Sequence, residues 1–351
     1  MKIEELLLHM IDQKASDLHF TVGQPPQLRV YGELVLTDYD ILDNNTIKIL
    51  AYSVLTPEQI KHFEQTKELD ASFGLKDISR FRINIFSQRG SIAVAIRRIP
   101  YEIASMEELG LPPIIKQFAD LPSGLFLVTG PAGSGKSTTI ASIIQYINEN
   151  YKTRIITIED PIEYLFKHKK STINQRELGG DTLTFAAALK HVFRQDPNIV
   201  FVGEMRDLET MQVVLTLAET GHLVFSTLHT RGATHAINRI VDVFPPYQQQ
   251  QIRIQLSMVL NGVMVQQLIA KKDGHGRVLA YELMNILPSI RNLIRENNLP
   301  QIYSVIQTGT EYGMCTMNQN LAKLYRKGLV TEDEIIKRST DVKELKSLLP
   351  K

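Results

Sequence analysis

From Gly124 onward, apolar runs alternate with amphipathic stretches. The runs read as strands, LFLVT, RIITI, NIVFV and LVFST, and a helical pattern follows the first of them. In that pattern Ile140, Ile143, Ile144 and Ile147 have the i, i+3, i+4, i+7 spacing of one helix face. Alternation of this kind predicts βα units, and therefore an α/β fold with a parallel sheet covered by helices.

The first hundred residues have a different pattern, typical of a small α+β unit. They predict a helix near residues 2–14, a strand-like segment over Gln27–Leu36, a helix after Asn44, and two strands around Arg89-Gly90. Prolines then mark a linker, and the chain after about residue 270 is mostly helical. We therefore predict four parts: a first domain 1–98, a linker 99–113, an α/β core 114–270 and a helical C-terminal region 271–351.

Composition narrows the class of protein. At 351 residues the chain is longer than a single hydrophobic core usually grows. The net charge of +1 gives no general attraction for nucleic acid, and the single Cys315 excludes a disulfide within the chain and a multi-thiolate zinc site. No apolar run approaches the roughly 20 residues needed to cross a bilayer, and MKIEELLLHM does not resemble a signal peptide. We expect a cytoplasmic protein that could serve a membrane only from its surface.

The segment GPAGSGKS, residues 130–137, matches the phosphate-binding loop G-x-x-x-x-G-K-[ST] in full. It stands between a predicted strand and a predicted helix, the order that this loop requires. Backbone N–H groups would face phosphate oxygens, Lys136 would reach the β and γ phosphates, and Ser137 would ligate Mg²⁺. The predicted ATP-binding residues are Gly130, Pro131, Ala132, Gly133, Ser134, Gly135, Lys136, Ser137 and Thr138.

Acidic residues follow two of the apolar strands. Glu159, Asp160 and Glu163 come after RIITI, and Glu204 comes after NIVFV, at the strand ends where ligands bind in open α/β sheets. We expect the Glu204 strand to lie beside the strand of the phosphate loop, so that Glu204 ligates Mg²⁺ directly or through water. Solvated loop charge, or for Glu204 a carboxylate at the start of the next helix, is the alternative. Asp207 is expected to cap that helix.

Two histidines flank the strand LVFST. A strand of this length separates His222 from His229 by roughly 20 Å, so the two cannot share a metal ion. His229 follows the strand and is better placed near the nucleotide. A purely structural hydrogen-bonding role is the alternative for each.

RFRINIFSQRGSIAVAIRRIP, residues 80–100, predicts a hairpin with Arg89-Gly90 as its loop. Positions whose numbers sum to 179 then face each other, so Ile83 meets Ile96 and Arg82 meets Arg97. Two arginines placed this way repel each other unless an anion lies between them. We hypothesise that this anion is a phosphate of ATP; solvated arginines, or arginines paired with nearby acidic residues, are the alternative.

Together these motifs resemble the type II/type IV secretion ATPases, most closely those that retract type IV pili. The resemblance covers nearly the whole chain and includes ASDLHFTVGQPPQLRVYGEL, TGPAGSGKSTT, ITIEDPIEY, VGEMRDLET and TGHLVFSTLHT. SIRNLIR resembles the AIRNLIR element of the retraction ATPases and departs from it only at Ser289. The residues of that element are Ile290, Arg291, Asn292, Leu293, Ile294 and Arg295.

The resemblance implies a PAS-like N-terminal domain, a RecA-like motor domain and a homohexameric ring that acts on an inner-membrane platform protein. It implies that arginines of the first domain approach ATP bound by the motor domain, and it favours Glu163 over Glu159 as general base. The alternatives are a pilus assembly or secretion ATPase of the same superfamily, a DNA translocase, and a nucleotide-gated scaffold. The family's four-cysteine zinc module is excluded because the chain has one cysteine.

Overall fold

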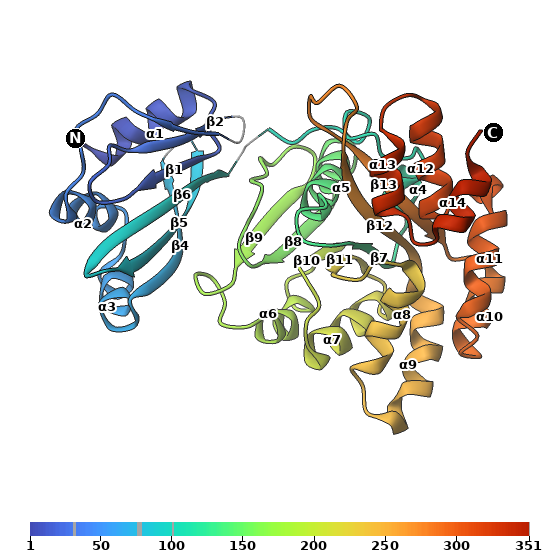
Figure 1. Cartoon of the computed structure of the whole chain (residues 1–351). Helices are drawn as coiled ribbons and strands as arrows, with labels where there is room; N and C mark the ends of the chain where they lie inside the picture. The colour runs from blue at the N-terminus through green and yellow to red at the C-terminus, as the bar shows by residue number, and fades with distance from the viewer. Residues whose placement is uncertain (31–32, 76–78, 100–101, 351) are drawn as a thin grey trace. The chain divides into compact units, whose positions relative to one another are not determined.

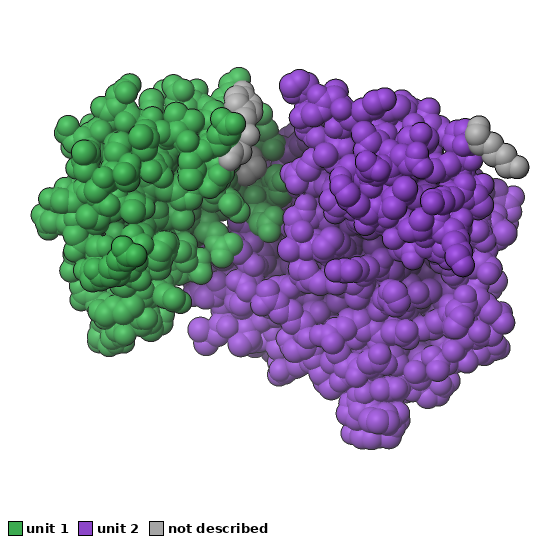
Figure 2. All heavy atoms as spheres, in the orientation of Figure 1, with its two compact units in different colours: residues 1–102, 163–165 green, residues 103–162, 166–351 purple. Residues whose placement is uncertain are grey.

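A computed structural model describes residues 1–351 except 31–32, 76–78, 100–101 and 351 (Figure 1). The described chain divides into two compact units (Figure 2). The first is Met1–Glu102 with Glu163–Leu165, and the second is Ile103–Ile162 with Phe166–Lys351. No helix among the described residues is long and apolar enough to span a membrane. The four-part division expected from the sequence stays a prediction.

The first unit is built on an antiparallel sheet. Within its described residues six strands lie in the order β3-β2-β1-β6-β5-β4. These strands are β1 Asp17–Phe20, β2 Gln27–Val30, β3 Glu33–Leu36, β4 Glu68–Leu75, β5 Ser79–Gln88 and β6 Ser91–Ile99. The helices that share a buried core with this sheet are α1 Ile3–Asp12, α2 Asn44–Tyr52 and α3 Pro57–Thr66 (Figure 1). The helices predicted near residues 2–14 and after Asn44 are confirmed.

The hairpin of β5 and β6 has the register predicted from its two-residue loop. Ile83 pairs with Ile96, and both side chains are buried in the core that the sheet shares with α1, α2 and α3. Arg82 pairs with Arg97 one position away. Because successive side chains of a strand point to opposite faces, the two arginines lie on the face of the sheet away from that core.

The segment Gln27–Leu36, predicted as one strand-like element, forms two strands. β2 and β3 pair in antiparallel register, with Gln27 opposite Leu36 and Val30 opposite Glu33. Apolar residues recur through both strands, so the pattern alone does not locate the reversal between them. The prediction also lacked β1, which is four residues long, and β4, in which charged and small residues interrupt the apolar ones.

The second unit contains the predicted parallel sheet. Within its described residues seven strands lie in the order β13-β12-β7-β11-β10-β8-β9, parallel from β12 to β9, with β13 antiparallel to β12. These strands are β7 Gly124–Thr129, β8 Arg154–Glu159, β9 Thr172–Glu177, β10 Ile199–Val202, β11 Leu223–Leu228, β12 Leu260–Ala270 and β13 Arg277–Asn285.

Helices cover both faces of this sheet (Figure 1). One face packs against α4 Ile115–Ala119 and α5 Lys136–Asn150, and the predicted isoleucine face of α5 is fully buried there. The other face packs against α6 Phe185–Val192, α7 Leu208–Glu219, α8 Ala233–Asp242 and α9 Pro246–Val259. That second core continues into α10 Pro288–Arg295, α11 Pro300–Thr308, α12 Met317–Arg326, α13 Glu332–Arg338 and α14 Val342–Leu348. A short 3₁₀ helix, Thr310–Tyr312, follows α11.

The C-terminal region is helical after β13, as predicted, and β13 itself pairs with β12 along Gly262–Ala270 and extends the sheet. One expectation about the second unit is wrong. The strand that ends before Glu204, β10, does not lie beside β7, because β11 lies between them and pairs with both. Strand order in a parallel sheet depends on crossover connections, which local sequence patterns do not specify.

Asp207 caps helix α7, as predicted. Its carboxylate accepts a hydrogen bond from Thr210 N at 2.8 Å and another from Thr210 Oγ1 at 3.0 Å. The first turn of the helix thereby gains an acceptor for one of its unpaired N–H groups.

Asp207→Ala should lower the free energy of unfolding by about 1 kcal/mol, because Ala cannot accept the Thr210 N–H bond. Asp207→Asn keeps a side-chain oxygen at the same place and should unfold close to the wild-type midpoint. Denaturant unfolding followed by circular dichroism measures both. Equal losses in the two variants would show that charge, rather than capping, is what the position contributes.

Candidate active site

The phosphate loop has the backbone shape that its glycines allow. It joins β7 to α5, and Gly130, Gly133 and Gly135 have φ of 145°, 74° and 88°, values that other residues rarely adopt. A Cβ on Gly130 would lie 2.4 Å from Gln266 O and 2.8 Å from Ser134 Oγ. Gly130 is therefore required both for its conformation and for the close approach of strand β12.

The side chain of Lys136 bonds back to the first residues of this loop. Its ammonium donates to Gly130 O at 2.9 Å and to Pro131 O at 3.1 Å, and the residue is buried. The buried Ser134 hydroxyl has no hydrogen-bond partner within the described residues. A buried cation and an unsatisfied hydroxyl inside a glycine loop at a helix N-terminus fit a bound phosphate group.

The other predicted nucleotide-binding residues continue along the same loop and helix. Pro131, Ala132 and Gly133 are exposed at the crest of the loop, whereas Ser137 and Thr138 are half-buried in the first turn of α5. The whole predicted set is therefore contiguous at the carboxyl end of β7.

His229 links the phosphate loop to Glu204. Its Nδ1 lies 3.5 Å from Lys136 Nζ, and its Nε2 lies 3.4 Å from Glu204 Oε2. The histidine follows β11, the strand that separates β7 from β10. The imidazole thus spans the gap that the intervening strand leaves between Lys136 and Glu204.

Hydroxyl groups hold the ends of these strands together. Thr129 Oγ1, at the end of β7, accepts from Thr230 N at 2.9 Å and lies 2.8 Å from Thr230 Oγ1. Thr227 Oγ1 donates to Gly203 O at 2.6 Å. Thr129, Thr227 and Thr230 were not predicted as site residues, although Thr129 adjoins Gly130, Thr230 adjoins His229, and Thr227 stands two residues before His229.

Glu204 has two partners in this structure. The carboxylate, whose side chain is 12% exposed, forms an ion pair with Arg206 Nη2 and lies against His229 Nε2. Its hydrogen bond raises the pKa of the Arg206 guanidinium above the ordinary value. Arg206 was missed from the sequence, although its position two residues after Glu204 was a local signal.

The acidic residues after β8 have different environments. Glu159 is buried and accepts from Thr157 Oγ1 at 2.6 Å and from Gln175 Nε2 at 3.2 Å. Asp160 is exposed and lies near enough to Arg206 to raise its pKa further. Glu163 is exposed, and its side chain forms no hydrogen bond or ion pair with any described residue.

His222 lies at the opposite end of β11 from His229. Its Nδ1 is 3.1 Å from Leu217 O and 3.3 Å from Thr220 Oγ1, and its ring meets Phe193 edge to face. These contacts place His222 at the C-terminal end of α7, and they do not bring it to the phosphate loop.

The paired arginines of the first unit each have a carboxylate partner. Arg82 Nη2 lies 3.2 Å from Asp70 Oδ1, and Arg97 Nε donates to Asp17 Oδ1 at 2.7 Å. The alternative stated from the sequence, arginines paired with nearby acidic residues, is therefore observed, because Asp70 and Asp17 supply negative charge. A role toward ATP stays a prediction.

The SIRNLIR element forms α10. Ile290 and Ile294 are fully buried, and Leu293 packs partly buried against the same core. Arg291 Nη1 donates to Ser257 O at 2.5 Å and to Met258 O at 2.7 Å, two carbonyls in the last turn of α9. Arg291 thereby caps α9 where the chain turns into β12.

Two polar residues of α10 stay at its surface. Asn292 and Arg295 are exposed and hydrogen-bond to each other through Arg295 Nη2 and Asn292 Oδ1. They are accessible on the folded chain, as is Ser289 at the start of the element.

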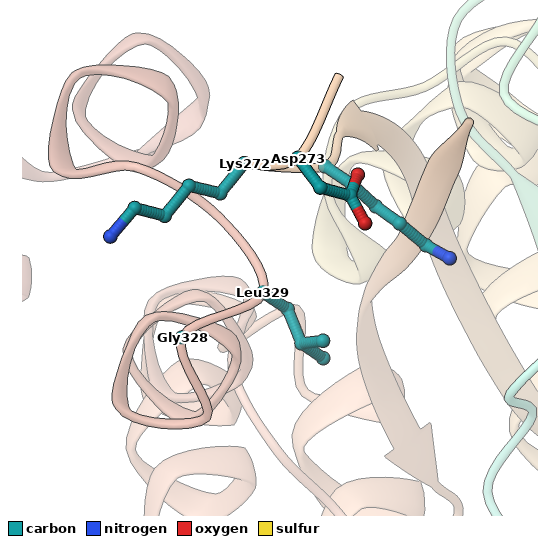
Figure 3. Close-up of a pocket in the computed structure, with 5 residues that line it drawn as sticks. Lys272, Asp273, Gly328 and Leu329 are labelled. Carbon is teal, nitrogen blue, oxygen red and sulfur yellow. The ribbon is translucent and has the colours of Figure 1, made fainter. Parts of the chain in front are cut away.

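A surface hollow of about 370 Å³ lies elsewhere, between the β12–β13 turn and the turn after α12 (Figure 3). Lys272, Asp273, Gly328 and Leu329 line it together with Lys271, and Lys272 N donates to Leu329 O at 2.9 Å. The ammonium of Lys272 points away from the carboxylate of Asp273 (Figure 3). Since its polar groups diverge, this hollow does not compete with the phosphate loop as the reactive site.

Comparisons with known proteins agree with this geometry. A model of the type II/IV secretion system protein family matches residues 1–337. The type IV pilus retraction ATPase PilT of Pseudomonas aeruginosa is 47% identical over 333 residues, 95% of this chain and 96% of that protein. A twitching motility protein of Neisseria gonorrhoeae is 46% identical over 314 residues, 90% of this chain and 84% of that protein.

A solved structure extends the likeness to three dimensions. The crystal structure of the pilus retraction motor PilT with bound ADP matches with a TM-score of 0.93 and 51% identity, covering 99% of each chain. The resemblance stated from the sequence motifs is confirmed. With a nucleotide-binding loop intact and a family match along nearly the whole chain, this protein belongs to the type II/IV secretion system protein family and is an ATPase.

Proposed function

We propose that this chain is the motor ATPase that retracts a type IV pilus, as one subunit of a homohexameric ring. The observation that carries the proposal is its similarity, over nearly the full length, to proteins named for pilus retraction and twitching motility. In this proposal the ring works in the cytoplasm, at the inner face of the membrane, and its movement acts on the platform protein of the pilus machine.

The phosphate loop supplies the binding step. Lys136 exchanges its bonds to Gly130 O and Pro131 O for oxygens of the β and γ phosphates when ATP enters. Ser137 and Glu204 are the residues that would hold Mg²⁺, with Glu204 acting directly or through water. A bound Mg²⁺ neutralises phosphate charge during phosphoryl transfer.

We assign the base to Glu163 and a supporting role to Glu204. Glu159 is held in the sheet by Thr157 and Gln175, and Glu204 is paired with Arg206 and His229. Glu163 is an exposed carboxylate whose lone pairs are not used by any described residue. It accepts the proton as water attacks the γ-phosphorus and ADP leaves, without a covalent enzyme intermediate.

His229 connects binding to turnover in this proposal. It contacts both Lys136, which would neutralise phosphate charge, and Glu204, which would hold Mg²⁺ directly or through water. A shift of the imidazole as ATP is hydrolysed therefore alters both neighbours at once.

In this proposal Arg82 and Arg97 supply further positive charge to the phosphates of ATP. Their side chains are 44% and 70% exposed. Arg82 can leave the exposed Asp70 at modest cost, whereas Arg97 would leave the buried Asp17, a cost that its new bonds to phosphate must offset. Phosphate oxygens would replace Asp70 and Asp17 as acceptors, in the manner of arginine fingers.

The main alternative is the assembly or secretion ATPase of the same family, which shares this chemistry and differs in the direction of the force. A DNA translocase is disfavoured by the net charge of +1, because phosphate-backbone binding depends on an excess of basic residues. A scaffold that binds ATP without hydrolysing it has no use for Glu163.

Glu163→Gln should lower kcat by about 10²-fold or more, because an amide cannot take the proton from water. Binding of a fluorescent ATP analogue should stay unchanged, since Glu163 lies outside the phosphate loop. Steady-state phosphate release measures turnover, with Glu159→Gln as the matched control. Normal turnover in Glu163→Gln would return the base role to Glu204.

Arg82→Ala and Arg97→Ala should each lower kcat by about 10³-fold if the arginines stabilise charge in the transition state. Arg89→Ala is the matched control, because Arg89 lies at the exposed turn of the same hairpin. Wild-type rates in both variants, measured by phosphate release, would refute the proposed arginine role.

Cells that lack the gene should assemble pili and fail to withdraw them. Fluorescent labelling of pili followed by time-lapse microscopy distinguishes the directions of force, because the retraction motor is not needed for assembly. Expression of the wild-type gene should restore withdrawal. A strain without pili would identify the chain as the assembly motor instead.

A further inference from the structure

Two buried polar side chains lie at neighbouring positions of the β12–β13 hairpin. Gln266, 1% exposed, pairs with Tyr281, and Glu282, 5% exposed, pairs with Val265. Most of the residues around them on these strands are apolar. Burying an amide and a carboxylate is unfavourable unless each finds partners, so their contacts indicate what the hairpin does.

Gln266 faces the phosphate loop. Its Nε2 donates to Thr139 Oγ1 at 2.9 Å, in the first turns of α5. Its backbone oxygen lies at Gly130, where it would be 2.4 Å from an added Cβ. The Gln266 side chain therefore holds the helix that follows the loop, and its backbone approaches the start of the loop closely.

Glu282 faces the histidine loop, residues 229–232 between β11 and α8. Its Oε1 accepts from Ala233 N at 2.8 Å. Ala233 is the first residue of α8, and the preceding Gly232 offers no side chain to cap this helix. A carboxylate from β13 thus replaces the missing N-cap, where the helix dipole favours negative charge.

The histidine loop is consequently pinned on both sides. Thr230, next to His229, is bonded to Thr129 at the end of β7, and Ala233 is bonded to Glu282. With both ends held, the imidazole can remain between Lys136 and Glu204.

The buried surroundings of Glu282 shift the pKa of its carboxyl group. Burial raises the pKa of its carboxyl, and hydrogen bonds from the N–H groups of Ala233 and Met317 oppose the rise. Met317 is the first residue of α12, so one carboxylate lies at the N-termini of two helices. The titratable neighbours that act on it are His235 and Glu344.

We propose that Glu282 is a positioning residue for ATP hydrolysis. From the β12–β13 hairpin, Glu282 holds the histidine loop in place. Gln266 positions the phosphate loop from the opposite face of the same hairpin. The two residues then affect different kinetic constants. Glu282 governs turnover, and Gln266 governs nucleotide affinity. The inference rests on the proposed role of His229.

The test compares kcat, KM for ATP and Tm in full-length variants. Glu282→Leu leaves the Ala233 N–H without its acceptor and should lower kcat by about tenfold or more, with KM within about twofold, because the displaced loop misaligns reacting groups. Glu282→Gln retains an acceptor oxygen and should restore most of kcat. Gln266→Leu should instead raise KM by about tenfold, since a loop atom displaced by about 1 Å weakens binding.

A second variant removes the same hydrogen bond from the other side. Ala233→Pro deletes the donor, and proline is accepted at the first position of a helix after an extended residue such as Gly232. It should lower kcat as Glu282→Leu does. This keeps the proposal testable if a leucine at position 282 prevents folding.

Met284→Ala is the matched control for lost stability. Met284 is fully buried two residues from Glu282 on the same face of β13, and its apolar side chain offers no acceptor for the Ala233 N–H group. It should lower Tm and leave kcat unchanged below the unfolding transition. If Glu282→Leu and Ala233→Pro likewise lower Tm alone, Glu282 is only a structural residue and the inference is wrong.

His229→Ala separates this inference from the role assigned to the histidine. Normal turnover in His229→Ala would overturn that role, and with it the reason for positioning the loop. Impaired turnover in His229→Ala together with normal turnover in Glu282→Leu would overturn the positioning inference alone.

Discussion

The parallel pairing of β11 with both β7 and β10 is the constraint on which the active site depends. Parallel strands end at the same edge of a sheet, so the phosphate loop, the histidine loop and Glu204 are brought to one place by backbone hydrogen bonds. The position of β11 in the middle lets His229 reach Lys136 on one side and Glu204 on the other. The hydrogen bond between Thr129 and Thr230 then holds the carboxyl ends of β7 and β11 side by side.

Buried polar contacts hold the loops around this edge. Lys136 bonds to the carbonyls of its own loop, and Gln266 and Glu282 reach the phosphate and histidine loops from the two faces of one hairpin. Each of these groups is costly to bury alone and is held in one geometry by its partners. Exposed pairs such as Lys190 with Glu209 are screened by water and contribute little by comparison. The fold thus concentrates its specific interactions where phosphate chemistry needs fixed positions.

In the first unit, the apolar core and the charged side chains lie on opposite faces of the sheet, because successive residues of a strand point to opposite faces. Side chains on one face of the sheet form the core with the helices, whereas Arg82 and Arg97 project from the other. Asp17 is buried at this polar face, where it bonds to Arg97 and lies 3.9 Å from Arg29. The arginines are therefore neutralised within their own unit.

Local sequence by itself determined the features that arise within one or two elements. The phosphate loop follows from glycine spacing between a strand and a helix, and the Arg82–Arg97 register follows because a two-residue turn permits one alignment. The Asp207 cap is likewise set within four residues. Strand order was beyond such reasoning, because a crossover can return a strand to either side of its neighbour. Only the tertiary structure therefore decided that His229 bridges to Lys136, 93 residues away, and that Glu282 caps a distant helix, since both contacts exist only once the order of the strands is set.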